Sequence, residues 1–291
     1  MKINLHRFIA EFSRDRDMDS FNYYSREIED RFAAHVGFRR HHTPKMRPDH
    51  DPKYSPITWQ APIDGYVEGI RIMTFNAMYG NALIHIAREK KAEFPNGWRI
   101  DEVIQNLMQL RREYKAGMCL RNEQYPMYKT YAYISKHLIN SMFYIVGNHG
   151  SAIDIGSYEI VAYAREQGKA AALKIIESGA IILNHRIDTI AYYGDQVEVE
   201  GVHHERFNKA VFAKNGYAYG NDIITSAIPF VRLTVEGFGE RLSYKPSEAQ
   251  MCAAAERIAK KRKMYTDEYL AYVNKTKEDV DREISCMDLC L

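Results

Sequence analysis

The chain has 291 residues and a formal net charge of +2, with 46% hydrophobic and 27% charged residues. This composition is ordinary for a globular protein, and it excludes a strongly basic chain whose charge alone would indicate nucleic acid as a partner. No apolar run approaches the roughly 18 residues that span a membrane, and the N-terminus lacks the apolar region of a secretory signal. We therefore expect a protein of a reducing compartment with no membrane partner, in which the four cysteines are free thiols.

Residues 1–62 are predicted to form an irregular polar extension. It contains one helix, over residues 20–36, where Phe21, Ile28 and Phe32 recur at helical spacing. Residues 39–53 are rich in basic residues, histidine and proline, which indicates an extended loop. The positive charge of this loop could contact phosphates, or the loop could simply be solvated.

The rest of the chain alternates strand and helix patterns. Residues 66–79 predict a strand that ends in a turn at 76–80, and residues 180–183 and 189–201 predict a hairpin. Helices are predicted over residues 100–118, 128–144, 153–178, 247–264 and 267–290. Strand, helical pair, long helix, hairpin and helical tail in this order indicate an α+β fold, an antiparallel sheet with helices on one face.

Three segments in this order resemble motifs of family B DNA polymerases, especially the short protein-primed viral kind. Thr74-Phe-Asn-Ala-Met-Tyr-Gly80 resembles the Asp-x-x-Ser-Leu-Tyr-Pro turn of that family. Lys136-His-Leu-Ile-Asn-Ser-Met-Phe-Tyr144 is similar to the Lys-x-x-x-Asn-Ser-x-Tyr-Gly helix of the fingers, and Leu110-Arg-Arg-Glu-Tyr-Lys115 to the helix before it. Ile187-Asp-Thr-Ile-Ala191 resembles the Asp-Thr-Asp-Ser hairpin. The resemblance covers about residues 57–200.

The resemblance implies a domain organisation and a set of binding residues. It implies a polymerase-like palm over residues 63–246, with a helical fingers insertion at about 95–145 and a helical tail over 247–291. The positions that match nucleotide-binding or nucleic-acid-binding residues of the family are Tyr79, Arg112, Lys136, Asn140 and Ser141. Asn140 and Ser141 could equally satisfy local backbone groups, and Lys136 could be an ordinary surface lysine.

The catalytic positions of the family are altered. Polymerase chemistry uses two metal ions about 3.5–4 Å apart, held by carboxylates from neighbouring strands. The resemblance places Thr74 and Ile190 at those carboxylate positions, and only Asp188, at the first aspartate of the hairpin, is acidic. A register that starts the hairpin motif at Tyr193 instead gives Asp195 and Val197, and fails at the same point. We therefore predict no metal site, no cofactor and no catalytic residue.

The leading hypothesis is a non-catalytic polymerase relative, encoded by a virus or phage and present in the infected cytoplasm or the virion. It would bind nucleic acid as a replication accessory, or bind a protein partner as part of an assembly. One alternative is a subunit or fragment of a split DNA polymerase, in which a partner chain supplies the missing carboxylates for Mg²⁺. The other alternative is a structural scaffold that binds only protein.

Two further clusters are weaker signals. His203 and His204 are adjacent in the sequence, and adjacent residues on a strand point to opposite faces, so a shared metal ion is not expected. The run Lys260-Lys-Arg-Lys263 ends a predicted helix, where it could complement the helix dipole or bind phosphates.

Overall fold

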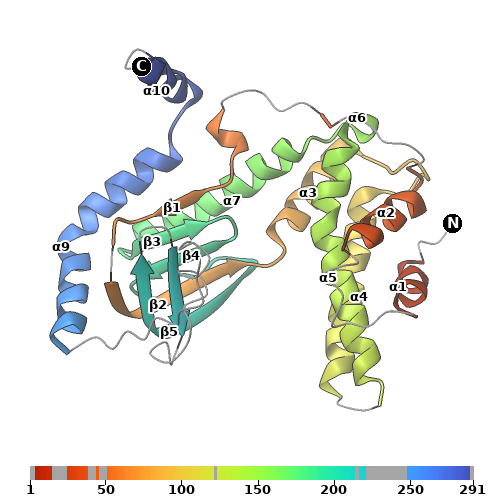
Figure 1. Cartoon of the computed structure of the whole chain (residues 1–291), viewed down its shortest axis with the longest axis horizontal. Coiled ribbons are helices and arrows are strands. Elements are labelled where there is room, and N and C mark those ends of the chain that lie inside the picture. Colours follow the sequence, from red (N-terminus) through yellow and green to blue (C-terminus); the bar gives the residue numbers. More distant parts are fainter. Residues whose placement is uncertain are drawn as a thin grey trace. The chain divides into compact units, whose positions relative to one another are not determined.

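The computed structural model describes residues 4–14, 25–38, 44–45, 51–63, 65–120, 123–213, 216–220 and 248–288 (Figure 1). The chain divides into two compact units. The helical unit consists of Met1–Asp49 and Ala77–Tyr163, and the sheet unit consists of His50–Asn76 and Ala164–Leu291. These units differ from the expected boundaries at residues 62 and 246, because the N-terminal helices pack with the helical hairpin and the C-terminal helix packs on the sheet.

The helical unit is built around a hairpin of two long helices. Its elements are α1 (Leu5–Ser13), α2 (Ser25–His35), α3 (Met78–Lys90), α4 (Ile100–Cys119), α5 (Tyr125–Asn148), α6 (Gly150–Ile153) and the first turns of α7 (Ser157–Glu177). The predicted helices over 100–118 and 128–144 are confirmed as α4 and α5. The two pack closely at Gly117, where a Cβ atom would lie only 2.7 Å from the ring of Tyr128.

Among the described helices of this unit, α1, α3 and the four-residue α6 were not predicted. α1 lies in a stretch that was expected to be irregular. Its apolar residues Phe8, Ile9 and Phe12 are buried, and Asn4 caps the helix by accepting a hydrogen bond from the Arg7 amide at 2.9 Å. α3 begins at Met78, where the sequence indicated only a turn, because Ala77 takes a left-handed conformation (φ 49°) that reverses the chain directly into a helix.

The sheet unit contains a six-stranded antiparallel sheet with the order β1-β3-β4-β2-β5-β6. The strands are β1 (Thr58–Gln60), β2 (Gly65–Phe75), β3 (Ile181–Arg186), β4 (Thr189–Tyr193), β5 (Val202–Ala213) and β6 (Gly216–Gly220), and a short 3₁₀ helix, η2 (Pro52–Tyr54), precedes them. The α+β class with an antiparallel sheet is confirmed. The hairpin β5–β6 was not predicted.

Successive side chains of a strand point to opposite faces, and here both faces are covered by helix. The face that we call the α9 face includes Ile72, Leu183 and Ala191 with Ile258 and Tyr265 of α9 (Glu248–Val273). The opposite α7 face includes Met73, Ile182, Ile190 and Tyr192 with Ala171 and Ile175 of α7. The structure therefore differs from the expected single helical layer, because α9 places apolar residues against the second face.

The C-terminal helices have different limits from those predicted. α9 continues past Lys260–Lys263, where a break was expected, because Tyr265 and Tyr269 are buried against the sheet and keep the chain helical. A second helix, α10, covers Lys277–Asp288. Within the described ranges, no helix is long and apolar enough to cross a membrane.

Candidate nucleic-acid interface

The end of β2 lies beside the β3–β4 hairpin, as the resemblance implies. Met73 pairs with Ile190 and Thr74 pairs with Thr189, and the Phe75 amide donates a hydrogen bond to the Asp188 carbonyl at 2.8 Å. The hairpin turns at Ile187 and Asp188, with Ile187 at φ 57°. The expectation that residues 66–79 and 180–200 contain neighbouring antiparallel strands is confirmed; the turn between β3 and β4 lies at Ile187 and Asp188, whereas Tyr193 ends β4.

The residue that faces Thr74 is Thr189. Residues paired directly across two strands share a face, and adjacent residues do not. Thr74 and Thr189 therefore lie on the α9 face, whereas Ile190 is fully buried on the α7 face. Thr74 thus lies opposite the segment from Asp188 to Ile190, as expected, and the side chain directly across from it is a second threonine.

This end of the sheet has few anionic oxygens. Asp188 is half-buried at the turn, and its carboxylate accepts a hydrogen bond from the Thr189 hydroxyl at 3.2 Å. Glu198 and Glu200 are exposed in the connection after β4 has ended at Tyr193. Mg²⁺ prefers carboxylate oxygens, and two neutral hydroxyls are a poor replacement for two carboxylates.

The strand β5 pairs with β2 on the side opposite β4, and it adds an imidazole and a carboxylate at this end of the sheet. His203 of β5 pairs with Thr74 and therefore lies on the α9 face, with its Nε2 3.5 Å from Glu205 Oε1. His204 points to the other face, as expected for adjacent strand residues. Across the residues whose placement is described, no group of three or more His, Cys, Asp or Glu side chains is arranged to hold a metal ion.

The helix α5 brings Lys136 and Asn140 to one exposed surface. They are four residues apart, so they lie on successive turns of the same helix face, and both are exposed. Ser141 is different, because it is buried and its hydroxyl donates a hydrogen bond to Glu29 Oε1 of α2 at 2.8 Å. Lys136 and Asn140 are thus available to a ligand, whereas Ser141 joins α5 to α2.

The remaining candidates from the sequence are also in the helical unit. Arg112 is exposed on α4. Tyr79, at the start of α3, stacks on Phe143 of α5 with ring centroids 5.0 Å apart and an interplanar angle of 24°. The ring of Tyr79 therefore packs against α5 and is half-buried.

The basic loop over residues 39–53 lies largely outside the described residues. Of its cations, Lys45 and Lys53 are described, and both are paired. Lys45 Nζ lies 2.8 Å from Asp154 Oδ1, and this hydrogen bond raises the pKa of the lysine. Lys53 Nζ lies 3.0 Å from Asp51 Oδ2. The proposed contact between this loop and phosphates stays a prediction.

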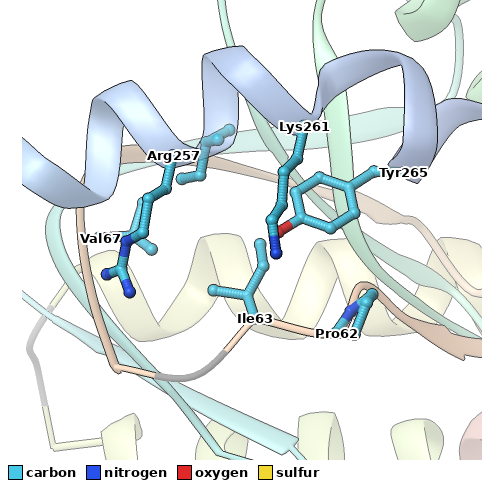
Figure 2. A pocket seen from close by; sticks show the side chains of 7 residues that line it. Pro62, Ile63, Val67, Arg257, Lys261 and Tyr265 are labelled. Atoms are coloured by element: carbon cyan, nitrogen blue, oxygen red, sulfur yellow. The ribbon is translucent and has the colours of Figure 1, made fainter.

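The basic residues of α9 lie in different surroundings. Arg262 lies over Gly179, with its Nη2 2.9 Å from where a Cβ of that residue would stand. This places a cation at the C-terminal end of α7, where it complements the helix dipole. Arg257 and Lys261 instead line a small pocket of about 60 Å³ at the start of β2, together with Tyr265 (Figure 2). Nucleotide-sized ligands occupy several hundred Å³, so the pocket is too small for one.

Sequence reasoning missed four exposed residues of α5. Tyr125, Lys129, Tyr133 and Tyr144 are all exposed, although only the Lys-x-x-x-Asn-Ser pattern had been considered. Their spacing at multiples of a helical turn from Lys136 was the available signal.

No protein family model matches the sequence, and no curated protein matches it. Among solved structures, the chain is similar to that of the family B DNA polymerase from the hyperthermophilic archaeon Pyrobaculum calidifontis. The TM-score is 0.49 and the sequence identity is 12%, and the alignment covers 80% of this chain. The chain spans 36% of the length of that polymerase chain.

Proposed function

We propose that the chain is a non-catalytic, polymerase-like protein that binds nucleic acid through the exposed face of α5. The observation that carries this proposal is the composition of that face. It presents Lys136 and Asn140 side by side, and the 24 residues of α5 include no aspartate or glutamate. Phosphate contacts by lysine and arginine supply most of the affinity of sequence-independent nucleic-acid binding.

The local charge matters more here than the charge of the whole chain. The net charge of +2 is nearly neutral. The hairpin nevertheless exposes Lys129 and Lys136 on α5, and Arg112 and Lys115 on α4. Phosphate attraction falls off within about 10 Å at ordinary salt, so a local cation pair such as Lys129 and Lys136 can bind a polyanion even though the chain as a whole is balanced.

The proposal that the chain is non-catalytic rests on three residues that lie side by side on neighbouring strands. They are Thr189 of β4, Thr74 of β2 and His203 of β5. In a two-metal mechanism, carboxylates hold the ions that neutralise charge on the attacking and leaving oxygens. Thr74 and Thr189 face each other across β2 and β4 and offer only neutral hydroxyls. The arrangement supports binding without nucleotide transfer, and it does not favour the split-polymerase alternative, because the altered positions lie within segments that this chain provides.

The salt dependence of binding tests this function. We expect the full chain to bind a fluorescently labelled DNA oligonucleotide at low salt, with log K falling linearly as log salt rises. The Lys136→Ala and Arg112→Ala variants should each reduce that slope by roughly 0.7–0.9, because each removes one phosphate contact. A matched control is Lys174→Ala, which removes an exposed lysine of α7 in the sheet unit.

Two results would contradict the proposal. One is the absence of binding to DNA and to RNA at low salt, which would favour a scaffold that binds only protein. The other is an equal loss for Lys136→Ala and Lys174→Ala, which would show that any positive charge serves and that α5 is not the interface.

A further inference from the structure

The exposed face of α5 alternates aromatic and cationic side chains. At 100° per residue, six exposed residues fall within an arc of about 100°, and at 1.5 Å per residue they extend over about 28 Å. We call this set the α5 stripe; its members are Tyr125, Lys129, Tyr133, Lys136, Asn140 and Tyr144.

The tyrosines of the stripe are unusually accessible. The exposed fractions are 38% for Tyr125, 38% for Tyr133 and 60% for Tyr144. Within the described part of the chain, these three are the only tyrosines among the exposed large hydrophobic side chains. Partly exposed aromatic rings gathered on one helix face offer a surface on which a flat apolar group can stack.

One of these rings is supported from behind. Tyr144 packs edge-on against Phe143, with centroids 5.4 Å apart and an interplanar angle of 85°, and Phe143 stacks in turn on Tyr79 of α3. A ring held by its neighbours loses little side-chain freedom when a ligand stacks on it, which favours binding.

The cations lie between the rings. Lys129 and Lys136 are seven residues apart, or about 10 Å along the helix, and Tyr133 stands between them. Proteins that bind single strands without sequence preference combine such a positive track with aromatic rings on which bases stack. A strand rises about 3.4 Å per nucleotide in a duplex and roughly twice that when extended, so the stripe is long enough for about four to eight nucleotides.

We infer that the α5 stripe binds single-stranded nucleic acid, with bases stacked on Tyr133 and Tyr144 and phosphates contacting Lys129 and Lys136. This inference rests on the proposed function and narrows it to the single strand. A duplex keeps its bases paired and stacked inside, so it can use the two lysines but not the tyrosine rings. The stripe should therefore favour single strands with little dependence on sequence.

The test compares a labelled single-stranded 20-mer with the duplex of the same sequence, by fluorescence anisotropy on the full chain. We expect Tyr133→Ala and Tyr144→Ala each to weaken single-strand binding by about 5- to 150-fold, the range found for one base–aromatic stack. Duplex binding should change by less than about twofold. Tyr144→Phe should retain single-strand affinity, because stacking needs the ring and not the hydroxyl.

The control is Met264→Ala, which removes an exposed apolar side chain of α9 that is 37% exposed. It should leave both affinities unchanged. Circular dichroism of each variant shows whether α5 remains helical, and these exposed positions should tolerate alanine.

Failure of this inference differs from failure of the proposed function. If the tyrosine variants bind both forms as tightly as the unmodified chain while Lys136→Ala weakens binding, the stacking inference is wrong and the proposed function stands. If the unmodified chain binds neither form at low salt, both are wrong. If Tyr144→Phe loses as much affinity as Tyr144→Ala, the hydroxyl is responsible and the stacking inference is again overturned.

Discussion

At the scale of single residues, the pairing of Thr74 with Thr189 decides how the polymerase resemblance is interpreted. The sequence motif pointed to Ile190 as the replaced carboxylate position, because the family hairpin carries its second aspartate there. The strand register shows that Ile190 is buried on the opposite face. The sequence alone could not reveal which face Ile190 occupies. A shift of one residue in the strand pairing exchanges the two faces, and only the observed register shows which pairing forms.

A pair of aspartates can test the assignment of faces. In a Thr74→Asp, Thr189→Asp double variant, two carboxylates would face each other beside Asp188. Without metal the like charges should lower stability, and Mn²⁺ should restore it. At a free Mn²⁺ concentration a hundred times the dissociation constant, binding should raise the free energy of unfolding by about 2.7 kcal/mol. The measurement is the thermal midpoint with and without Mn²⁺.

The matched control is Thr74→Asp, Ile190→Asp, which places the second carboxylate in the core. This variant should be strongly destabilised, and metal should not rescue it, because the two carboxylates point to opposite faces. If Mn²⁺ stabilises this variant and does not stabilise Thr74→Asp, Thr189→Asp, then Ile190 is the position that matches the second aspartate of the family hairpin.

A buried histidine gives the sheet unit a pH dependence. His185 is fully buried, and its Nδ1 lies 2.7 Å from the Tyr269 hydroxyl. Burial lowers the pKa of His185 to about 3; a backbone hydrogen bond with Ile187 opposes this, and the charge of Arg165 contributes to it. Between pH 6.5 and about 3 the unfolded chain binds a proton on this residue that the folded chain does not, so stability should fall as the pH falls.

The expected contribution is up to about 1.4 kcal/mol for each pH unit in that window. Urea unfolding at several pH values measures it. The His185→Gln variant should lose this part of the slope, whereas His85→Gln, which changes a histidine that is 44% exposed, should keep it. An unchanged slope in His185→Gln would show that other groups cause the acid sensitivity.

At the scale of elements, the regular amphipathic segments were predictable and the irregular ones were not. α4 was recognised because Val103, Leu107 and Tyr114 repeat on one face, and all three are buried. β5 was missed because its sequence, Val202–Ala213, opens with consecutive polar residues and shows no clean alternation. Its place in the sheet comes from long-range pairing with β2, which no local pattern encodes.

The proposed binding surface was only partly predictable, for a related reason. Lys136 and Asn140 were found through a motif, which reads consecutive positions in the chain. Tyr133 lies outside that motif, and Tyr144 stands at its glycine position, so neither was selected; their connection with Lys136 exists only on the helix surface. Ser141 shows the opposite error: it belongs to the same motif, but the helix turns it toward Glu29.

At the scale of the whole molecule, the two units differ in the groups that they expose. The helical unit exposes Lys129 and Lys136 on α5, whereas at the end of the sheet the paired residues Thr74 and Thr189 offer only neutral hydroxyls. The net charge of +2 leaves no broad basic field, so the proposed binding depends on the local charge of α5. Binding and catalysis can therefore be tested separately.

We expect no nucleotide incorporation by the purified chain with Mg²⁺ or Mn²⁺ on a primed template. Metal ions contribute several kcal/mol to stabilising the transition state, and each 1.36 kcal/mol is a factor of ten in rate, so the loss should be many orders of magnitude. The assay measures primer extension on a gel against a control without protein.

A Thr74→Lys, Asp188→Ala variant distinguishes real activity from contamination, because it removes the last acidic residue of the motif. If the unmodified chain extends primers and this variant does not, Thr74 and Asp188 belong to a catalytic site after all. Extension that appears only when a co-purifying protein is added would instead show that the partner supplies the carboxylates, and would establish the split-polymerase alternative.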